Sequence, residues 1–237
     1  MQLINLSSIE AATDLVECAK NTRKTNFPNT YTTFVNPFSY NKIPNSSSFD
    51  YIFADGGSLC IAHNIFNKIK VKRISFDLSS IGKEILEVAN YRRLKLSIIG
   101  GKPNEIMLSV QNLNKLYPNI NIIYYRDGYF DSTHEKYTCI KKIKSIKPHI
   151  TLIGMGTPLQ EEFLMMLKEI KCGGMTFTCG GFISQTSEKP DYYHPIIKFT
   201  KLFWLQRAWN ETHVRKRLLK DYPIFFIRFI LSNLKQL

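Results

Sequence analysis

The sequence predicts an α/β fold, with a Rossmann-like parallel sheet core, helices on both faces and a C-terminal helical appendage. From residue 94 onward, short apolar runs alternate with amphipathic segments of helical period, which is typical of a parallel sheet covered on both faces. The 237 residues, 44% of them hydrophobic, suffice for one sizeable core and a small appendage. After Pro190 the alternation stops. We therefore expect an α/β core over 1–195 and an appendage over 196–237.

The first part of the chain predicts a capped helix, two strands and two further helices. Ser7 and Ser8 can cap a helix that continues through Lys20, with apolar residues at helical spacing. The strands are expected at 31–36, ending in the turn "NPFS", and at 50–54, ending at Asp55-Gly56-Gly57. The helices are expected at 58–68 and 79–90.

Strands and helices then alternate to residue 179. Strands are expected at 94–100, 120–125, 149–154 and 175–179, with helices ending at Leu116, covering 132–146 and ending near Ile170. Binding sites in such sheets lie at the carboxyl ends of the strands. Those ends carry Asn36, Asp55, Gly100-Gly101, Asp127-Gly128, Gly154-Met155-Gly156 and Gly180-Gly181.

The appendage is expected to form a long helix over 196–222 that begins after Pro195 and is broken by Pro223. The following segment, "IFFIRFILSNL" (224–234), is apolar and aromatic with one Arg inside. It is shorter than the ~18 residues that span a bilayer, but it can lie in the membrane interface. Packing on the core is an equally good interpretation.

The net charge of +13 is concentrated in this appendage. Its 42 residues contain nine Lys or Arg against Glu211 and Asp221, a balance of +7. Such a tail predicts an anionic partner, which can be nucleic acid, anionic lipid or a phosphorylated substrate. No RNP, helix-turn-helix or zinc signature is present, so a nucleic-acid-binding protein remains an alternative based on charge alone.

Several other classes of protein lack their signatures. The five cysteines form no CxxC pair and no zinc spacing, and free thiols in a reducing cytosol fit best. No HExxH motif or pair of metal-binding carboxylates stands out, so we expect no metal and no cofactor. The turn "GGKPNE" (100–105) lacks the third glycine of G-x-G-x-x-G, which disfavours a nucleotide-dependent oxidoreductase. The N-terminus shows no signal-peptide pattern.

The stretch "GMGTPLQEEF" (154–163) joins an expected strand to an expected helix. Thr157 as N-cap, Pro158 at N1 and Gln160 at N3 would form a capping box. Gly154 and Gly156 leave room for a close neighbour, which capping does not require. Gln160 therefore has two interpretations, a cap for its own helix or an amide that faces a ligand.

Other candidate residues are similarly ambiguous when taken alone. Asp55 at a strand end can act as a general base, but aspartate is also common in turns before glycine. Tyr129 in "RDGYF" belongs either to the core or to a stacking surface. Arg207, Arg215 and Arg217 suit phosphate contacts. They do not line one stripe, because the second and third lie about 80° and about 280° from the first around a helix.

Taken in order, several motifs resemble the WecG/TagA/CpsF glycosyltransferase family over most of the chain. The motifs are "FVNPFSY" (34–40), "ADGG" (54–57), "RISFDL" (73–78), "LSIIGGKP" (96–103), "LYPNINI" (116–122), "DGYF" (127–130), "IGMGTPLQEEF" (153–163), "CGGFIS" (179–184) and "LFWLQRAWNE" (202–211). The resemblance implies an inverting, metal-independent glycosyltransferase that is cytoplasmic and peripheral on the inner face of the cell membrane. It would move a sugar from a UDP-sugar to an undecaprenyl-diphosphate-linked sugar, for capsule, teichoic acid or surface antigen synthesis.

The resemblance also assigns site residues. Asp55 matches the catalytic base, which would take the proton from the acceptor hydroxyl. The substrate-binding residues that it implies are Asn36, Thr33, Gly100, Gly101, Asp127, Gly128, Tyr129, Gly156, Gln160, Arg207, Arg215 and Arg217. The implied partners are the UDP-sugar, the polyprenyl-diphosphate acceptor and an anionic membrane surface, without nucleic acid; a homo-oligomer is left open.

The sequence departs from the family pattern at three places. Phe34 stands where the family often has Thr, and Thr33 lies one residue earlier. "YHP" (193–195) replaces the usual "RAP". In "ETHVRKR" (211–217) the usual proline is absent and the arginines are displaced by about one residue, so Arg215, Lys216 and Arg217 are alternative diphosphate contacts.

Overall fold

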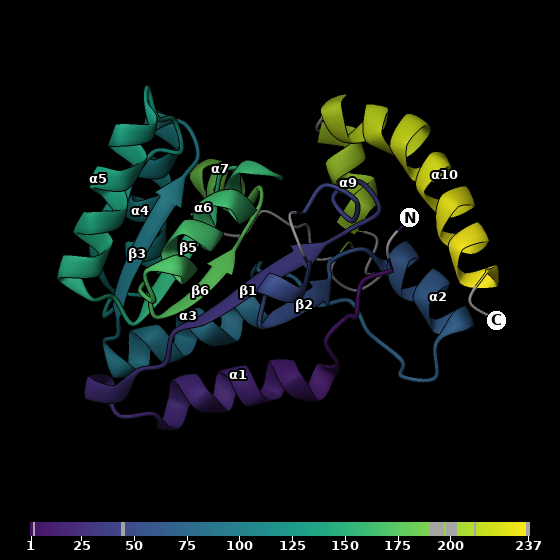
Figure 1. Ribbon diagram of the computed structural model, residues 1–237. Coiled ribbons are helices and arrows are strands. Elements are labelled where there is room, and N and C mark those ends of the chain that lie inside the picture. The colour runs from purple at the N-terminus through teal and green to yellow at the C-terminus, as the bar shows by residue number, and fades with distance from the viewer. Residues whose placement is uncertain (2, 44–45, 190–196, 198–202, 211, 236–237) are drawn as a thin grey trace.

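The structure is a computed structural model that describes residues 1, 3–43, 46–189, 197, 203–210 and 212–235. Within these residues, six parallel strands form one sheet in the order β2-β1-β6-β5-β3-β4 (Figure 1). The strands are β1 (Thr30–Val35), β2 (Tyr51–Ala54), β3 (Lys95–Gly100), β4 (Asn121–Arg126), β5 (Ile150–Gly154) and β6 (Met175–Thr178). The predicted α/β class and parallel sheet are confirmed.

Helices cover both faces of this sheet. One face is covered by α1 (Ile9–Asn21), α3 (Ile81–Arg92), α4 (Pro103–Leu116) and α7 (Phe182–Glu188). The other is covered by α2 (Gly57–Phe66), α5 (Thr133–Ile146), α6 (Leu159–Glu169) and α10 (Thr212–Leu234). Short 3-10 turns, η1 (Lys24–Asn26) and η2 (Ser46–Ser48), complete the connections.

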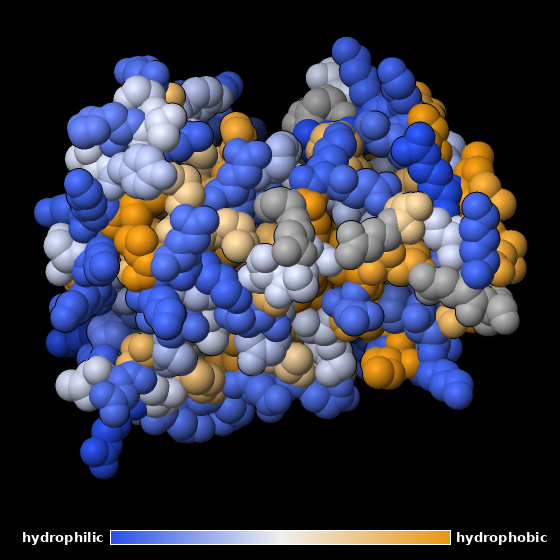
Figure 2. All heavy atoms as spheres, in the orientation of Figure 1, coloured by the Kyte–Doolittle hydropathy of each residue, from blue (hydrophilic) through white to orange (hydrophobic). Residues whose placement is uncertain are grey.

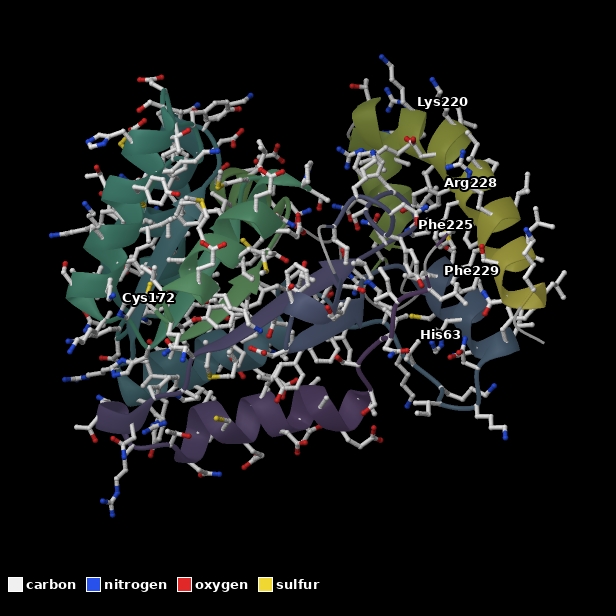
Figure 3. All side chains as sticks on the ribbon, viewed as in Figure 1. His63, Cys172, Lys220, Phe225, Arg228 and Phe229 are labelled. Atoms are coloured by element: carbon white, nitrogen blue, oxygen red, sulfur yellow. The ribbon has the colours of Figure 1, made fainter. Side chains whose placement is uncertain are left out.

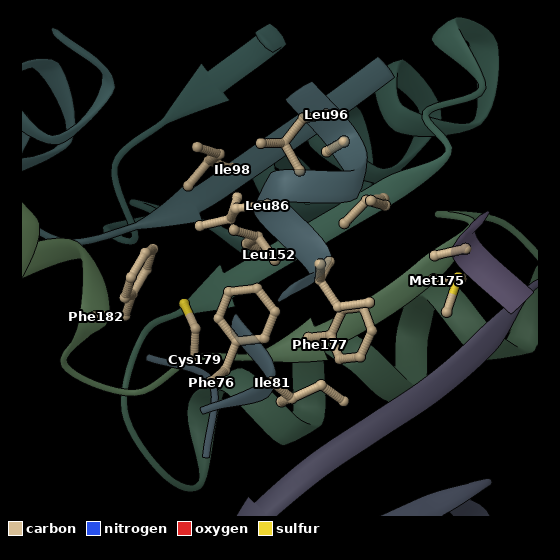
Figure 4. Close-up of a cluster of buried hydrophobic side chains, with 14 of the residues drawn as sticks. Phe76, Ile81, Leu86, Leu96, Ile98, Leu152, Met175, Phe177, Cys179 and Phe182 are labelled. Carbon is tan, nitrogen blue, oxygen red and sulfur yellow. The ribbon is translucent and has the colours of Figure 1, made fainter. Parts of the chain in front are cut away.

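The two faces bury separate apolar clusters because alternate residues of a strand point to opposite sides. On β3, Leu96 and Ile98 enter the cluster with α3 and α4, whereas Ile99 enters the other. Figure 4 shows the first cluster, in which Leu152 and Phe177 of neighbouring strands meet the ring of Phe76. Both sides of the central strands are thus dry, as continuous apolar runs predict for a parallel sheet.

Two helices begin at serine N-caps, and Ser8 is one of the two residues that the sequence predicts as a cap for the first helix. The Ser8 hydroxyl accepts a hydrogen bond from the Ala11 N–H at the start of α1. Ser132 does the same for the Glu135 N–H of α5. Ser7 has a different role. Its hydroxyl accepts a hydrogen bond from the Ile52 N–H, which ties the N-terminal segment to β2.

The appendage differs from its prediction. Helix α9 (Phe203–Asn210) ends before Thr212, and α10 runs through Pro223 instead of breaking there. A proline inside a helix costs about 3 kcal/mol. Beyond it, Phe225 and Phe229 are buried, and burying each ring contributes about 1.5–3 kcal/mol, which offsets that cost. Most of the predicted helix over 196–202 lies outside the described residues.

Helix α10 packs on the core with one face and exposes the other. Figure 3 shows Phe225 and Phe229 directed from α10 toward the body of the protein, where their rings lie 5.2 and 5.8 Å from that of Tyr40. Ile224, Ile227 and several later aliphatic residues are exposed. Among the described residues, no helix combines the length and apolar character needed to cross a bilayer. All five cysteines are free thiols, four of them buried.

Candidate functional site

A cavity of about 630 Å³ opens at the carboxyl edge of the sheet. In the described part of the chain, residues that follow each of the six strands line it. They are Asn36 after β1, Asp55 after β2, Gly101 after β3, Gly128 and Tyr129 after β4, Gly156 after β5, and Gly180 and Gly181 after β6. The hollow between the two upper lobes in Figure 2 lies over this edge. Its volume is in the range of small-molecule sites, about 300–1,000 Å³.

Asp55 is placed by backbone and side-chain contacts. Its N–H donates to the Val35 carbonyl at 2.8 Å, which fixes it at the junction of β1 and β2. The Arg73 guanidinium donates to the Asp55 carboxylate at 3.1 Å and to the Asp77 carboxylate at 2.7 Å. Both carboxylates and the guanidinium line the cavity. The result is an acidic group at the cavity wall, oriented by a cation.

Asp77 is the buried anchor of this group. Burial opposes its charge, but the Arg73 guanidinium and the Ser75 and Ser79 hydroxyls outweigh that effect and hold the pKa of Asp77 below its usual value. The hydroxyls donate to it at 2.6 and 2.5 Å. Arg73 is therefore anchored on the buried Asp77 and extends from it to Asp55.

The sequence does not predict a site role for Arg73, although this residue begins "RISFDL" (73–78), one of the motifs that resemble the family. The segment that carries it lies against β2, where the Ile74 N–H donates to the Ala54 carbonyl at 2.9 Å. That pairing joins residues 20 positions apart, which no local pattern reveals. The available signal was the spacing of four between Arg73 and Asp77, which suits an ion pair.

Asn36 organises the loop that follows β1. Its side-chain oxygen accepts hydrogen bonds from the N–H groups of Phe38 at 3.0 Å and Ser39 at 3.1 Å. Its own N–H donates to the Ser39 hydroxyl. This Asx-turn brings the Phe38 ring to the cavity wall. Asn36 is thus both a cavity residue and the residue that shapes its loop.

Gln160 does not complete the predicted capping box. Helix α6 begins at Leu159, with Pro158 at the N-cap and no side-chain cap. The Gln160 amide donates to the Glu161 carboxylate at 2.8 Å, and its carbonyl oxygen accepts from the Gly180 N–H at 3.2 Å. Because the Gly180 N–H can only donate, it holds the carbonyl oxygen of Gln160 and directs the amide nitrogen to Glu161. The side chain joins the end of β5 to the end of β6 at the cavity.

Glu161 is fully buried beneath the cavity and does not line it. Its Oε1 also accepts from the hydroxyls of Thr33 and Thr157, both at 3.1 Å, while Oε2 has no hydrogen-bond partner among the described residues. Burial raises the pKa of Glu161 despite these hydrogen bonds. Thr33 is also bonded to Thr178 at 3.0 Å, so it supports this network rather than the cavity wall.

The glycines at the strand ends have different reasons to be glycine. A Cβ at Gly154 would lie 2.7 Å from the Ile183 side chain, so packing within the protein requires that residue to be small. Gly156 has φ of +76°, and a Cβ there meets no atom within 4 Å in the described residues. Gly101 has φ of +67°, and its N–H donates to the Gly154 carbonyl at 3.0 Å. The expected close neighbour of Gly154 is therefore the protein itself, whereas Gly156 faces open space.

The appendage reaches the cavity through Arg217. Its guanidinium carbon lies 3.8 Å from the centroid of the Phe38 ring, and the Lys42 ammonium lies 3.2 Å from the same centroid. Two cations so close to one centroid would collide on one face, so they occupy opposite faces. Arg217 lines the cavity. Arg215 instead donates to the Ala208 and Trp209 carbonyls, which ties α10 to the end of α9.

The structure thus gathers most of the predicted site residues in one cavity. Those that line it are Asn36, Asp55, Gly101, Gly128, Tyr129, Gly156, Gln160 and Arg217. Thr33, Gly100, Asp127 and Arg215 lie outside its lining. Asp127 shapes the neighbouring turn by accepting from the Tyr129 N–H at 2.8 Å. The side chain of Arg207 lies outside the described residues.

A cavity at the carboxyl edge of a parallel α/β sheet, with a carboxylate on its wall and an arginine from a separate helix, is the arrangement of an α/β protein that binds a small anionic ligand. The chain belongs to the WecG/TagA/CpsF glycosyltransferase family, whose model matches residues 1–237. Among the described residues, no group of three or more His, Cys, Asp or Glu forms a metal-binding cluster.

Curated relatives bear related names. The chain is 43% identical over 208 residues to the UDP-Gal:alpha-D-GlcNAc-diphosphoundecaprenol beta-1,4-galactosyltransferase of Shigella boydii, with 86% of this chain and 87% of the relative covered. It is 28% identical over 201 residues to the N-acetylglucosaminyldiphosphoundecaprenol N-acetyl-beta-D-mannosaminyltransferase of Staphylococcus aureus strain MW2, with 83% and 74% covered. The nucleic-acid alternative finds no support in these comparisons.

Proposed function

We propose that this enzyme transfers galactose from UDP-galactose to N-acetylglucosamine carried on undecaprenyl diphosphate. The relative from Shigella boydii, at 43% identity over most of both chains, supports this choice of sugar and acceptor. The more distant relative from Staphylococcus aureus has a name that specifies a different sugar and the same kind of lipid-linked acceptor. The acceptor class therefore has broader support than the donor sugar.

The observation that carries the proposal is that Asp55 and Arg217, from opposite ends of the chain, line one cavity. In the proposed reaction the Asp55 carboxylate takes the proton of the acceptor hydroxyl while that oxygen forms a bond to C1 of the sugar. The bond from C1 to the β-phosphate oxygen breaks, and UDP leaves with the electron pair. Attack opposite to the leaving group inverts the anomeric centre.

Arg217 and the strand-end amides would bind the diphosphate. Arginine is suited to bidentate contact with phosphate, and a cation near the departing UDP stabilises its developing charge. Gly101 and Gly156, both with positive φ at the cavity, allow the backbone to approach the ligand closely. Tyr129 is 63% exposed beside them and offers a ring for the nucleobase.

The acceptor lipid implies that the enzyme works as a peripheral protein on the inner face of the cell membrane. The exposed aliphatic face of α10, together with Arg228 on the helix and Lys235 just after it, suits the interface of an anionic bilayer. Helix α10 also carries Arg217, so contact with lipid and binding of the diphosphate would involve one helix.

The proposal is tested by measuring UDP release with a panel of UDP-sugars and a short-chain polyprenyl-diphosphate N-acetylglucosamine, with and without EDTA. We expect UDP-galactose to be the preferred donor and EDTA to leave turnover unchanged. Asp55→Asn should lower kcat by at least about a hundredfold. The matched control is Asp131→Asn, an exposed acidic residue after β4 that lies outside the cavity lining. Equal kcat in Asp55→Asn and wild type would remove Asp55 from the mechanism.

A further inference from the structure

Helix α2 carries an unpartnered apolar stripe. Ile61 and Ile65 on the helix and Ile69 in the turn after it are 68%, 69% and 69% exposed. Their spacing of four residues places the helical pair on one side of α2. The opposite side is already packed in the core, where Leu59, Cys60 and Ala62 are buried. The stripe therefore has no use in stabilising the described fold.

The charged residues in the segment that carries this stripe have one sign. Residues 56–76 contain no Asp or Glu. Lys68, Lys70 and Lys72 are exposed and alternate with Ile69 and the buried Val71. The Lys70 ammonium donates to the Asn67 carbonyl at 2.9 Å, so the turn after α2 is held by a hydrogen bond. Exposed isoleucines beside exposed lysines, in a segment without acidic residues, have the composition of an interfacial membrane contact.

The stripe is close to the exposed face of α10. Phe66 at the end of α2 packs edge to face on Phe229, with ring centroids 6.3 Å apart. Figures 1 and 3 show α2 and α10 together at the same end of the molecule. In Figure 2, hydrophobic spheres follow the outer edge of α10, and another hydrophobic group lies near α2. The two apolar faces thus belong to neighbouring helices.

Helix α2 also begins at the catalytic edge. Gly57 is its first residue, and Asp55 lies two residues earlier on the cavity wall. A helix of ten residues is about 15 Å long. A bilayer that contacts α2 would therefore lie within about 15 Å of the proposed base. That distance suits an acceptor whose sugar is carried on a lipid diphosphate.

We propose that Ile61, Ile65 and Ile69, with Lys68, Lys70 and Lys72, form a second membrane contact that docks α2 on an anionic lipid bilayer. This inference rests on the proposed function for its purpose, which is to present the lipid-linked acceptor to Asp55. A second copy of this chain is a poorer occupant, because a two-fold contact would bring the lysines of both copies together, and residues 56–76 contain no acidic residue to pair with them.

The test compares the full-length protein with a triple variant, Ile61→Ser, Ile65→Ser and Ile69→Ser. Binding is measured by co-sedimentation with vesicles of equal parts phosphatidylglycerol and phosphatidylcholine, and with vesicles of phosphatidylcholine alone. The matched control is Met107→Ser with Leu108→Ser, which removes exposed apolar side chains from α4. We expect the triple variant to lose about tenfold or more in partition to the anionic vesicles, with the control unchanged.

If circular dichroism shows that the triple variant is unfolded, a charge variant still tests the proposal. Lys68→Glu with Lys72→Glu leaves the isoleucines in place and should lower partition to the anionic vesicles alone. The inference is overturned if both variants bind these vesicles as wild type does. It is also overturned if the triple variant changes only the oligomeric state in size-exclusion chromatography, which would identify a second copy as the occupant.

Turnover separates this inference from the proposed function. With a water-soluble short-chain acceptor, the triple variant should release UDP at the wild-type rate, whereas with acceptor in vesicles its rate should fall about tenfold. If wild type turned over no UDP-sugar while its vesicle binding still depended on Ile61, Ile65 and Ile69, the proposed function would fail and the membrane contact would stand.

Discussion

The Arg73 guanidinium lies 3.1 Å from the Asp55 carboxylate and extends to it from its buried partner Asp77. The contact joins the end of β2 to the segment after α2, and it sets the direction in which the proposed base faces. Because the Asp55 side chain is partly exposed, at 24%, this contact restricts a group that water could otherwise reorient.

We expect Arg73→Gln to lower kcat for UDP release by about a hundredfold, because a misplaced base loses much of its catalytic effect. Arg73→Lys keeps the charge but not the forked donor geometry of arginine. Its kcat should therefore lie between that of wild type and that of Arg73→Gln. Lys72→Gln is the matched control, since it removes one positive charge from the neighbouring exposed position. The measurement is steady-state kinetics with a water-soluble acceptor; an unchanged kcat in Arg73→Gln would contradict the role.

Arg217 and Arg215 form a second matched pair, two residues apart on α10. Arg217→Gln should raise the KM for the UDP-sugar by about tenfold, because it removes a cation from the cavity. Arg215→Gln should leave that KM within about twofold and instead loosen the junction of α9 and α10, where each lost hydrogen bond costs about 1 kcal/mol. Donor KM and urea unfolding separate the two effects. Equal changes in donor KM in the two variants would contradict a specific role of Arg217 in donor binding.

The Phe38 ring stacks on the Arg217 guanidinium, so it should influence donor binding by positioning that cation. A cation–π contact contributes about 0.5–2 kcal/mol, and Phe38→Leu should raise the donor KM by about three- to tenfold with little change in kcat. Phe38→Tyr keeps the aromatic face and should restore the wild-type KM. A Leu variant with the wild-type KM, or a Tyr variant as impaired as Leu, would speak against this positioning role.

Asp77 provides a pH-dependent part of the stability. Its pKa is lower in the folded protein, so its contribution is present above the unfolded pKa of about 3.9 and is lost as the pH falls through the folded value. Asp77→Asn lacks this contribution and should be about 3 kcal/mol less stable at pH 7, since the Arg73 charge loses its buried partner. Urea unfolding at pH 7 and pH 3 should show the difference shrinking in acid; a constant difference would contradict the linkage.

The contribution of Glu161 to stability should depend on pH in the opposite direction to that of Asp77. Burial raises its pKa in the folded state, so the folded protein binds more protons and loses stability as the pH rises from about 4.3 toward the folded value. Glu161→Gln removes this dependence, and its stability relative to wild type should be greater at pH 8 than at pH 4. Glu161→Leu leaves the Thr33 and Gln160 donors without this acceptor and should cost about 1–3 kcal/mol for each. Urea unfolding of both variants at the two pH values provides the comparison.

The order of strands and helices and the positions of the candidate site could be read from the sequence. Apolar runs of strand length must be buried, and amphipathic segments must cover them, so the alternation after residue 94 determines a parallel α/β core. Such a core places the strand ends together, which is why Asn36, Asp55 and Gly156 are expected close together, and they do line one cavity. The family motifs added the chemistry of glycosyl transfer, which the fold alone does not specify.

Tertiary structure alone decided which of these residues contact one another. Gln160 fitted a local capping box, but its amide is held by Glu161 and by the Gly180 N–H of the next strand. Arg215 and Arg217 were equivalent by composition, yet one ties two helices together and the other stacks on Phe38 over the cavity. Pro223 stays inside a helix because Phe225 and Phe229 are anchored on Tyr40. The contacts of Gln160 with Gly180, of Arg217 with Phe38 and of Phe225 with Tyr40 join residues far apart in the chain, so a local sequence pattern does not reveal them.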